Sequence, residues 1–276
     1  MRQFLLKMAL WACIILAWML VIEHFMNRNK GSLKYLAGSD VLTALSKSKS
    51  PAGKSVLILG DSVGNQLYPS EQTYPHAVSL TCNRALSVAG HFFLLNNYVS
   101  ANEHALPDTI AMIMTPTSLQ NQLDRFAYHY MLKNFLTKEY KDEFNEELWT
   151  QVRNIPIYWS APLPFIRVSN FSPEYTPPKD DRYVLFSPIS QTYLERIIQL
   201  TDRIHAHFFL LCPPVDEAQK EEWEQVFERS AAKSEVPAAL FNQYSESMRF
   251  VRDSIGTDGI HLRADSIPQD YFGLLP

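Results

Sequence analysis

The sequence has few cysteines, no internal repeat and no basic patch interleaved with aromatic residues. Of its 3 cysteines, Cys13 lies in an apolar N-terminal run, so only Cys82 and Cys212 could pair in an oxidising compartment. The lack of a repeat excludes a solenoid or propeller built from copies of one unit. The lack of a basic patch, with a formal net charge of -4, excludes nucleic acid as an expected partner.

The N-terminus carries one long apolar run, Phe4 to Ile22, which only Lys7 interrupts. At about 1.5 Å per helical residue the run can cross most of a bilayer core of roughly 30 Å, with Lys7 reaching the headgroups. A cleaved signal peptide would need small residues at a cleavage site, and residues 21–29 offer none, so an uncleaved signal anchor is favoured. Positive charges flank both ends. The short N-terminal tail then predicts that the rest of the chain lies outside the cytoplasm.

Composition divides the chain into three parts. Residues 1–26 are the predicted anchor. Residues 27–54 are rich in Lys, Ser, Gly and Asn, which predicts a solvated tether with one short helix near Asp40 to Leu45. Residues 55–276 are long enough for one globular domain with a substantial core.

Five apolar segments of this domain are predicted to be β-strands: 55–60, 85–90, 109–116, 207–214 and a weaker one at 238–243. Residues 191–207 and 216–233 have the apolar spacing of amphipathic helices. Near-continuous apolar strands with intervening helices predict an α/β fold, with a mostly parallel sheet covered on both faces. In such sheets ligands bind at the carboxyl ends of the strands.

The stretch from about 119 to 190 is too long for a simple crossover connection. Residues 118–154 are predicted to form one or two amphipathic helices, whereas residues 155–188 are rich in proline and aromatic residues and have no clear period. Two interpretations stay open: an insertion that packs on the edge of the domain, or a cap that shapes a substrate pocket.

The first predicted strand ends on Gly60-Asp61-Ser62, where apolar residues give way to small and polar ones. A nucleophilic serine needs a base within hydrogen-bond reach, a group that orients the base, and N–H donors for the oxyanion. A sharp turn from strand to helix exposes the serine and leaves the first N–H groups of the helix without acceptors. The tripeptide also makes an ordinary turn or helix cap, so Ser62 indicates catalysis only together with a distant partner.

That partner is found near the C-terminus, in Asp258-Gly-Ile-His261. A spacing of three lets the carboxylate and the imidazole meet across one tight turn, where Asp258 would hold His261 in one tautomer. His205 and His207 could point both rings to one side of a strand, but no third metal ligand lies near them in the sequence. We therefore expect neither a metal nor an organic cofactor.

These residues resemble the signature blocks of the SGNH (GDSL-type) hydrolases over roughly residues 55 to 265. The matching blocks are Gly60-Asp61-Ser62-Val63 after the first strand, Gly90 after the second, and Asp258-x-x-His261. The resemblance implies a flavodoxin-like three-layer α/β/α fold, with Ser62 as nucleophile, His261 as base and Asp258 as the orienting group. It also implies that the backbone N–H groups of Ser62 and Gly90 are oxyanion donors.

The third block departs from the family pattern of Gly-x-Asn-Asp, in which the Asn side chain is an oxyanion donor. Here the strand ends in Thr115-Pro116-Thr117-Ser118, and Thr117 falls where the Asn would be. The Thr117 hydroxyl is the expected donor, with Ser118 and Asn121 as other candidates. Losing one such donor typically costs about 2.7–4 kcal/mol of transition-state stabilisation.

The anchor and the altered third block are similar to those of SGNH-like proteins that act on bacterial envelope glycans. We therefore expect a membrane-anchored, extracytoplasmic serine esterase or O-acyltransferase that acts on an ester of an envelope glycan or a similar substrate. A multi-span membrane acyltransferase is a candidate partner. The alternative is a non-catalytic SGNH-like module that binds glycan or scaffolds a membrane complex.

The predicted strand order is 2-1-3-4-5, which would bring Ser62, Gly90 and Thr117 to one carboxyl edge of the sheet. In this order Cys82 and Cys212 lie on strands roughly 14 Å apart, at about 4.8 Å per strand. Disulfide-bonded Cα atoms lie within about 7 Å of each other, so no disulfide between the two is expected.

Overall fold

The computed structural model describes residues 1–28, 38–178, 185–233, 236–252, 255–256, 260–263 and 270–274. The strands are β1 (Val56–Gly60), β2 (Ala77–Ser79), β3 (Thr109–Ile113), β4 (His207–Leu211), β5 (Val215–Asp216) and β6 (Phe250–Val251). The α-helices are α1 (Arg2–Arg28), α2 (Ser39–Ser48), α3 (Ser62–Leu67), α4 (Ser87–Ala101), α5 (Pro116–Leu119), α6 (Lys133–Phe135), α7 (Glu146–Asn154), α8 (Pro164–Val168), α9 (Pro188–Arg203), α10 (Lys220–Lys233) and α11 (Ala238–Ser247). Shorter helical turns are η2 (Arg84–Leu86), η3 (Tyr128–Leu132), η4 (Lys141–Glu143), η5 (Tyr158–Ser160) and η6 (Glu217–Gln219).

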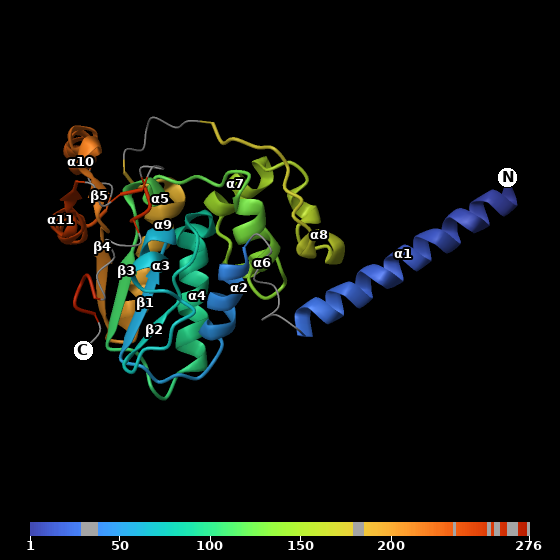
Figure 1. Ribbon diagram of the computed structural model, residues 1–276, viewed down its shortest axis with the longest axis horizontal. Helices are drawn as coiled ribbons and strands as arrows, with labels where there is room; N and C mark the ends of the chain where they lie inside the picture. The colour runs from blue at the N-terminus through green and yellow to red at the C-terminus, as the bar shows by residue number, and fades with distance from the viewer. Residues whose placement is uncertain are drawn as a thin grey trace.

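Four parallel strands form the central sheet in the order β2-β1-β3-β4, with helices packed around it (Figure 1). Val56 of β1 pairs with Ala77 of β2 on one side and with Thr109 of β3 on the other. Thr109 in turn pairs with His207 of β4. The predicted α/β class with a parallel sheet is therefore confirmed. The short strands β5 and β6 form a separate parallel pair.

The prediction of a second strand at 85–90 is wrong. These residues lie in η2 and in the first turn of α4, and the second strand is instead β2. Helix α4 is buried on nearly all sides, so its apolar residues follow one another without the polar face that usually marks a helix. Gly90 consequently lies inside a helix, and Cys82 follows the second strand. Cys82 and Cys212 are both buried and free.

The predicted fifth strand at 238–243 is also wrong, because this segment is part of helix α11, which lies against β4. The Gln243 side chain accepts the Leu210 N–H at 3.0 Å, and the Ser247 hydroxyl accepts the Cys212 N–H at 2.8 Å. Polar side chains of α11 thus accept backbone N–H groups at this edge of the sheet, to which a fifth strand would otherwise have bonded.

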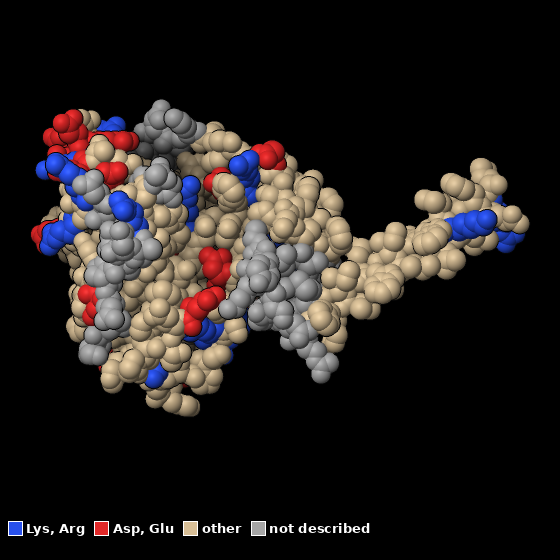
Figure 2. Space-filling view, viewed as in Figure 1, with Lys and Arg blue, Asp and Glu red and all other residues tan. Residues whose placement is uncertain are grey.

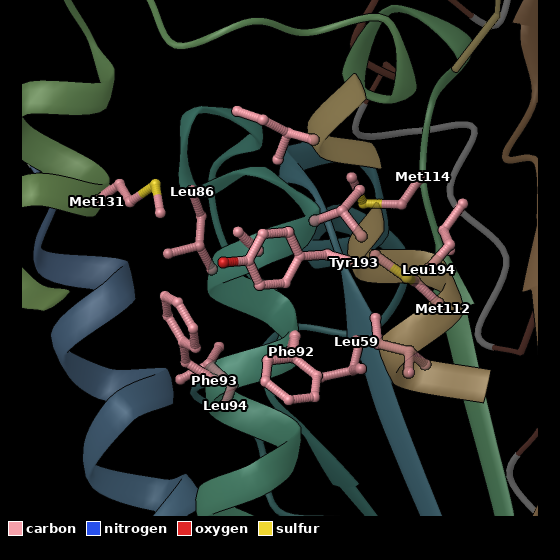
Figure 3. Close-up of a cluster of buried hydrophobic side chains, with 14 of the residues drawn as sticks. Leu59, Leu86, Phe92, Phe93, Leu94, Met112, Met114, Met131, Tyr193 and Leu194 are labelled. Carbon is pink, nitrogen blue, oxygen red and sulfur yellow. The ribbon is translucent and has the colours of Figure 1, made fainter. Parts of the chain in front are cut away.

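Side chains of β1 and β3 alternate between two cores. Leu57 and Leu59 face the larger core with α4 and α9, while Ile58 and Ile113 face a smaller core with α3 and Leu262. Figure 3 shows Phe92, Phe93 and Tyr193 together in the larger core. The ring centroids of Phe92 and Phe93 lie 5.8 and 5.9 Å from that of Tyr193. The sheet is therefore covered on one face by helices and on the other by α3 and part of the C-terminal segment.

The stretch predicted as an insertion packs into this larger core. Rings of Phe135 and Phe144 lie 5.3 and 5.5 Å from the ring of Phe93 on α4. In place of the one or two amphipathic helices predicted, residues 118–154 form several short ones, from the end of α5 to α7. The segment thus belongs to the body of the domain.

The helix expected near Asp40 to Leu45 is α2, but it is not part of a solvated tether. Val41 and Ala44 are fully buried in the larger core, and α2 packs against α4. The first part of the predicted tether, residues 29–37, lies outside the described residues.

Helix α1 extends away from the domain (Figure 1). Its segment Arg2–Ile22 is long and apolar enough to span a membrane, and none of it is buried by the rest of the chain. The end of α1 nearest the domain lies beside α8, and the two helices are in contact (Figure 1).

The edge of β4 allows a matched test of the contact with α11. Ser245 and Ser247 each donate to the carbonyl three residues earlier, but only Ser247 also accepts a backbone N–H, that of Cys212 just after β4. We expect Ser247→Ala to lower the free energy of unfolding by about 1–3 kcal/mol, because it leaves the Cys212 N–H without its acceptor. Ser245→Ala should lower the free energy of unfolding by less. If urea unfolding shows equal losses for the two variants, the role of Ser247 as acceptor of the Cys212 N–H is contradicted.

Candidate active site

The end of β1 is organised around the buried carboxylate of Asp61. Asp61 caps α3, and its Oδ1 accepts the N–H groups of Val63 and Gly64 at 3.0 and 3.2 Å. Its Oδ2 accepts the Thr115 N–H and hydroxyl, both at 2.7 Å, and the Ser118 hydroxyl at 2.5 Å. These donors compensate the carboxylate for its complete burial. They also join the start of α3 to the turn after β3.

Gly60 is required where β1 meets β3. A Cβ atom at this position would lie 2.5 Å from the carbonyl oxygen of Ile113, closer than non-bonded atoms approach. The glycine therefore lets the two strand ends come together just before Asp61, and it fixes the place where α3 begins.

Ser62 is the first residue of α3, and its Oγ lies 2.9 Å from Nε2 of His261. Both residues are partly buried, and they are 199 positions apart in the chain. The structure thus brings two of the predicted catalytic residues into direct contact. Asp258, the predicted orienting group, lies outside the described residues.

Gln66 connects α3 to the segment that carries His261. Its Oε1 accepts the Leu262 N–H at 2.9 Å, and its Nε2 donates to the Leu262 carbonyl at 3.2 Å. Ser62 and Gln66 are four residues apart and so share one face of α3. The same helix face therefore carries Ser62 and holds the residue next to His261. The sequence analysis did not identify Gln66, since only the folded chain places it beside Leu262.

Ser62 and His261 open onto a cavity of about 310 Å³, which is within the usual size range of small-molecule sites. The cavity is lined by Ser62, Asn83, Arg84, Ala85, Asp124, Phe126, Tyr130, Ile260 and His261. Its walls come from the start of α3, the turn after β2, the stretch that runs into η3 and the C-terminal segment. Asp124, Phe126 and Tyr130 belong to the stretch at about 119 to 190, which therefore contributes to the cavity wall.

The predicted oxyanion donors other than Ser62 do not line this cavity. Gly90 lies in α4, where a Cβ atom would be 2.4 Å from the Leu86 side chain. Thr117 lines a separate cavity of about 20 Å³, and its hydroxyl bonds to that of Thr115. Of the other candidates, Ser118 bonds to Asp61, and Asn121 donates to the Arg84 carbonyl at 3.4 Å.

The turn after β2 brings in residues that sequence reasoning missed. The Asn83 Oδ1 accepts the Ala85 N–H at 3.0 Å as the cap of η2, and this sets the orientation of the amide. The Asp40 carboxylate of α2 accepts the Asn83 backbone N–H at 2.7 Å. Arg84 is the first residue of η2, so its N–H has no acceptor within that turn. The signal in the sequence that could have indicated this turn is Asn83, a residue type that often caps the start of a helix.

His91 and Cys82 are two buried titratable side chains that interact electrostatically with Asp61. Burial lowers the pKa of His91 to about 4, an effect that the negative charge of Asp61 only partly opposes. Burial also raises the pKa of the Cys82 thiol well above its ordinary value. At pH 7 neither side chain carries a charge beside the Asp61 carboxylate.

Within the described parts of the chain, no group of three or more His, Cys, Asp or Glu side chains could hold a metal ion. His205 and His207 are both exposed, next to and at the start of β4. The charged side chains of the cavity are Arg84 and Asp124, so its lining has no dominant sign.

No family model and no curated protein matches the chain. Among solved structures, the chain is similar to a protein from Streptococcus pneumonia that is provisionally described as a platelet activating factor. The two are 14% identical over 97% of each chain, with a TM-score of 0.37. A similarity of this size carries no argument about function.

The contacts of Gln66 predict that it positions His261. We expect Gln66→Ala to slow the reaction of Ser62 with a fluorophosphonate probe by about 10²-fold, since a small misplacement of a catalytic group has effects of that size. Gln191→Ala is the control, because Gln191 also bonds to a backbone carbonyl but lies on α9. A folded Gln66→Ala variant that reacts at the wild-type rate would contradict the prediction.

Proposed function

We propose that the chain is a membrane-anchored, extracytoplasmic serine esterase or O-acyltransferase of the SGNH type. Its substrate is an ester of a cell-envelope glycan or a similar compound. The observation that carries the proposal is the 2.9 Å contact between Ser62 Oγ and His261 Nε2 at the wall of a cavity of about 310 Å³. A serine and an imidazole in such contact at a cavity are the parts that acyl transfer requires.

In this proposal His261 Nε2 takes the proton of the Ser62 hydroxyl as the oxygen attacks the ester carbonyl. The tetrahedral intermediate collapses when His261 returns that proton to the leaving alkoxide, and an acyl-Ser62 ester remains. Water or a sugar hydroxyl then attacks the acyl-enzyme by the same steps, which restores Ser62. Asp258 is the proposed group that orients His261.

Of the oxyanion donors proposed here, the Ser62 N–H is shared with the family pattern, whereas Arg84 and Asn83 are not. Ser62 and Arg84 each begin a helical turn, so their backbone N–H groups have no acceptor within it. The Asn83 side chain uses its oxygen to cap η2, which leaves its amide N–H groups as donors in the wall of the same cavity. We propose that Asn83, in the turn after β2, supplies the side-chain donor that the family takes from the end of its third strand.

Helix α1 supports the proposed anchoring because it contains a segment long and apolar enough to span a membrane. The extracytoplasmic location rests on the short N-terminal tail, because positive charges flank both ends of that segment. A multi-span membrane acyltransferase is the partner proposed for the transfer reaction. The altered third block favours the second candidate, a non-catalytic module that binds glycan or scaffolds a membrane complex.

The contact between Ser62 and His261 predicts that the full chain reacts with a fluorophosphonate probe at Ser62 and hydrolyses a short-chain aryl ester. Ser62→Ala should abolish labelling without unfolding the protein, because it removes only the hydroxyl of a partly buried side chain. His261→Ala should reduce the labelling rate by orders of magnitude, since the general base is lost. A folded wild-type chain that is not labelled, beside a labelled control esterase, would favour the binding module.

The proposed role of Asn83 predicts that Asn83→Ser lowers kcat for ester hydrolysis by about 10²–10³-fold, the usual cost of losing one oxyanion donor. Serine retains an oxygen that can cap η2, so the fold should persist. Thr117→Val is the comparison, because Thr117 lines the other cavity and its loss should leave kcat nearly unchanged. The reverse ranking of the two variants would restore Thr117 as the donor.

A further inference from the structure

A group of large apolar side chains is exposed on the segment that includes η5 and α8. The group consists of Ile157, Trp159, Leu163, Phe165 and Phe171, and is called here the η5–α8 surface. Between 42% and 62% of each residue is exposed. Single exposed apolar residues are common on proteins, but a concentration of large ones on one segment indicates an interaction site.

The segment beneath this surface is firmly held. Ile155 and Ala161 are fully buried in the larger core, and the hydroxyls of Tyr128 and Ser160 bond to each other. Ile157 has a φ of 49°, a conformation that a β-branched residue rarely adopts. Its carbonyl accepts both the N–H and the hydroxyl of Ser160, at 2.9 and 2.8 Å. The part of the segment that carries Ile157 and Trp159 is therefore held against the domain while these two side chains face solvent.

The η5–α8 surface is next to the helix that can span a membrane. Helix α8 is in contact with α1, and it lies at the end of α1 nearest the domain (Figure 1). Figure 2 shows charged side chains gathered over the end of the domain with α10 and α11, while the visible surface at α8 is uncharged. The exposed apolar side chains are thus on the side of the domain from which α1 extends.

We propose that the η5–α8 surface docks into the interface of the lipid bilayer that α1 spans, so that the domain has a second attachment to the membrane. The proposal rests on the membrane anchoring proposed above. Tryptophan, phenylalanine and leucine are the side chains typical of such interfacial surfaces, and tryptophan favours the level of the headgroups. The contact between α8 and α1 is the reason for choosing lipid as the occupant.

Docking would also fix the position of the cavity relative to the membrane. Residues 172–175 run beside the stretch that carries Phe126: the Ser172 hydroxyl donates to the Arg125 carbonyl at 2.7 Å, and the Arg125 N–H donates to the Tyr175 carbonyl at 3.1 Å. Phe126 is itself exposed and lines the cavity. One continuous set of contacts therefore links the η5–α8 surface to the rim of the proposed active site.

The test uses the full chain in lipid nanodiscs that contain nitroxide-labelled lipids, which quench a bimane label near the bilayer. Cys82 and Cys212 are buried, so a wild-type chain is labelled at Cys13 of α1, and this label reports anchoring. Phe171→Cys and Glu228→Cys, each combined with Cys13→Ser, place the label on the η5–α8 surface and on exposed α10. We expect the label to lose emission at positions 13 and 171 and to keep its emission at position 228.

A second pair of substitutions separates docking from mere closeness to α1. Leu163→Ser with Phe165→Ser should restore emission at position 171, because it removes apolar contact with lipid and leaves α1 unchanged. Quenching at position 13 without quenching at 171 would overturn docking and leave anchoring intact. Quenching at 171 that persists in the Leu163→Ser, Phe165→Ser variant would have the same meaning. If the label at position 13 is not quenched, both the docking and the membrane anchoring are overturned. A label at 171 that is shielded from iodide but not quenched by lipid would show that protein covers the surface, and would also overturn the proposal.

Discussion

The Asp61 carboxylate lies fully buried at the end of β1 and accepts hydrogen bonds on both of its oxygens. Removing such an ion from water costs several kcal/mol unless donors surround it. The donors come from the first turn of α3 and from the turn after β3, so the carboxylate is satisfied only when these two turns meet. This requirement fixes the direction in which α3 leaves the sheet, and with it the position of Ser62.

Within the described part of the C-terminal segment, His261 lies in neither a strand nor a helix. Its segment makes an isolated bridge between Ile255 and Leu262, and Leu262 packs in the smaller core under the sheet. The two hydrogen bonds between the Gln66 side chain and the Leu262 backbone give this segment a partner on α3. The geometry at Ser62 therefore depends on side chain–backbone contacts between distant parts of the chain more than on regular secondary structure.

The errors of the sequence analysis have one physical cause in common. Residues 85–90 and 238–243 are short apolar stretches, and such stretches have the same pattern in a buried helix as in a buried strand. Tertiary contacts decide between the two: α4 is enclosed by the sheet, α2 and α9, and α11 satisfies the edge of β4 with Gln243 and Ser247. Gly90 was consequently assigned to the wrong kind of element. Thr117 was predicted as an oxyanion donor from its position in the order of the motifs along the chain. That order does not show which cavity a side chain lines.

Local chemistry in the sequence determined the apolar helix α1, the strands β1, β3 and β4, and the turn in which Asp61 caps α3 before Ser62. It also indicated His261 as the partner of Ser62, because the spacing of Asp258 and His261 lets a carboxylate and an imidazole meet across one tight turn. Only the tertiary structure decided that Asn83, Arg84 and Phe126 share a cavity with Ser62, and that α2 belongs to the core. The reason is that a cavity wall is assembled from segments far apart in the chain, whose relative positions depend on how the sheet, α4 and the C-terminal segment pack together.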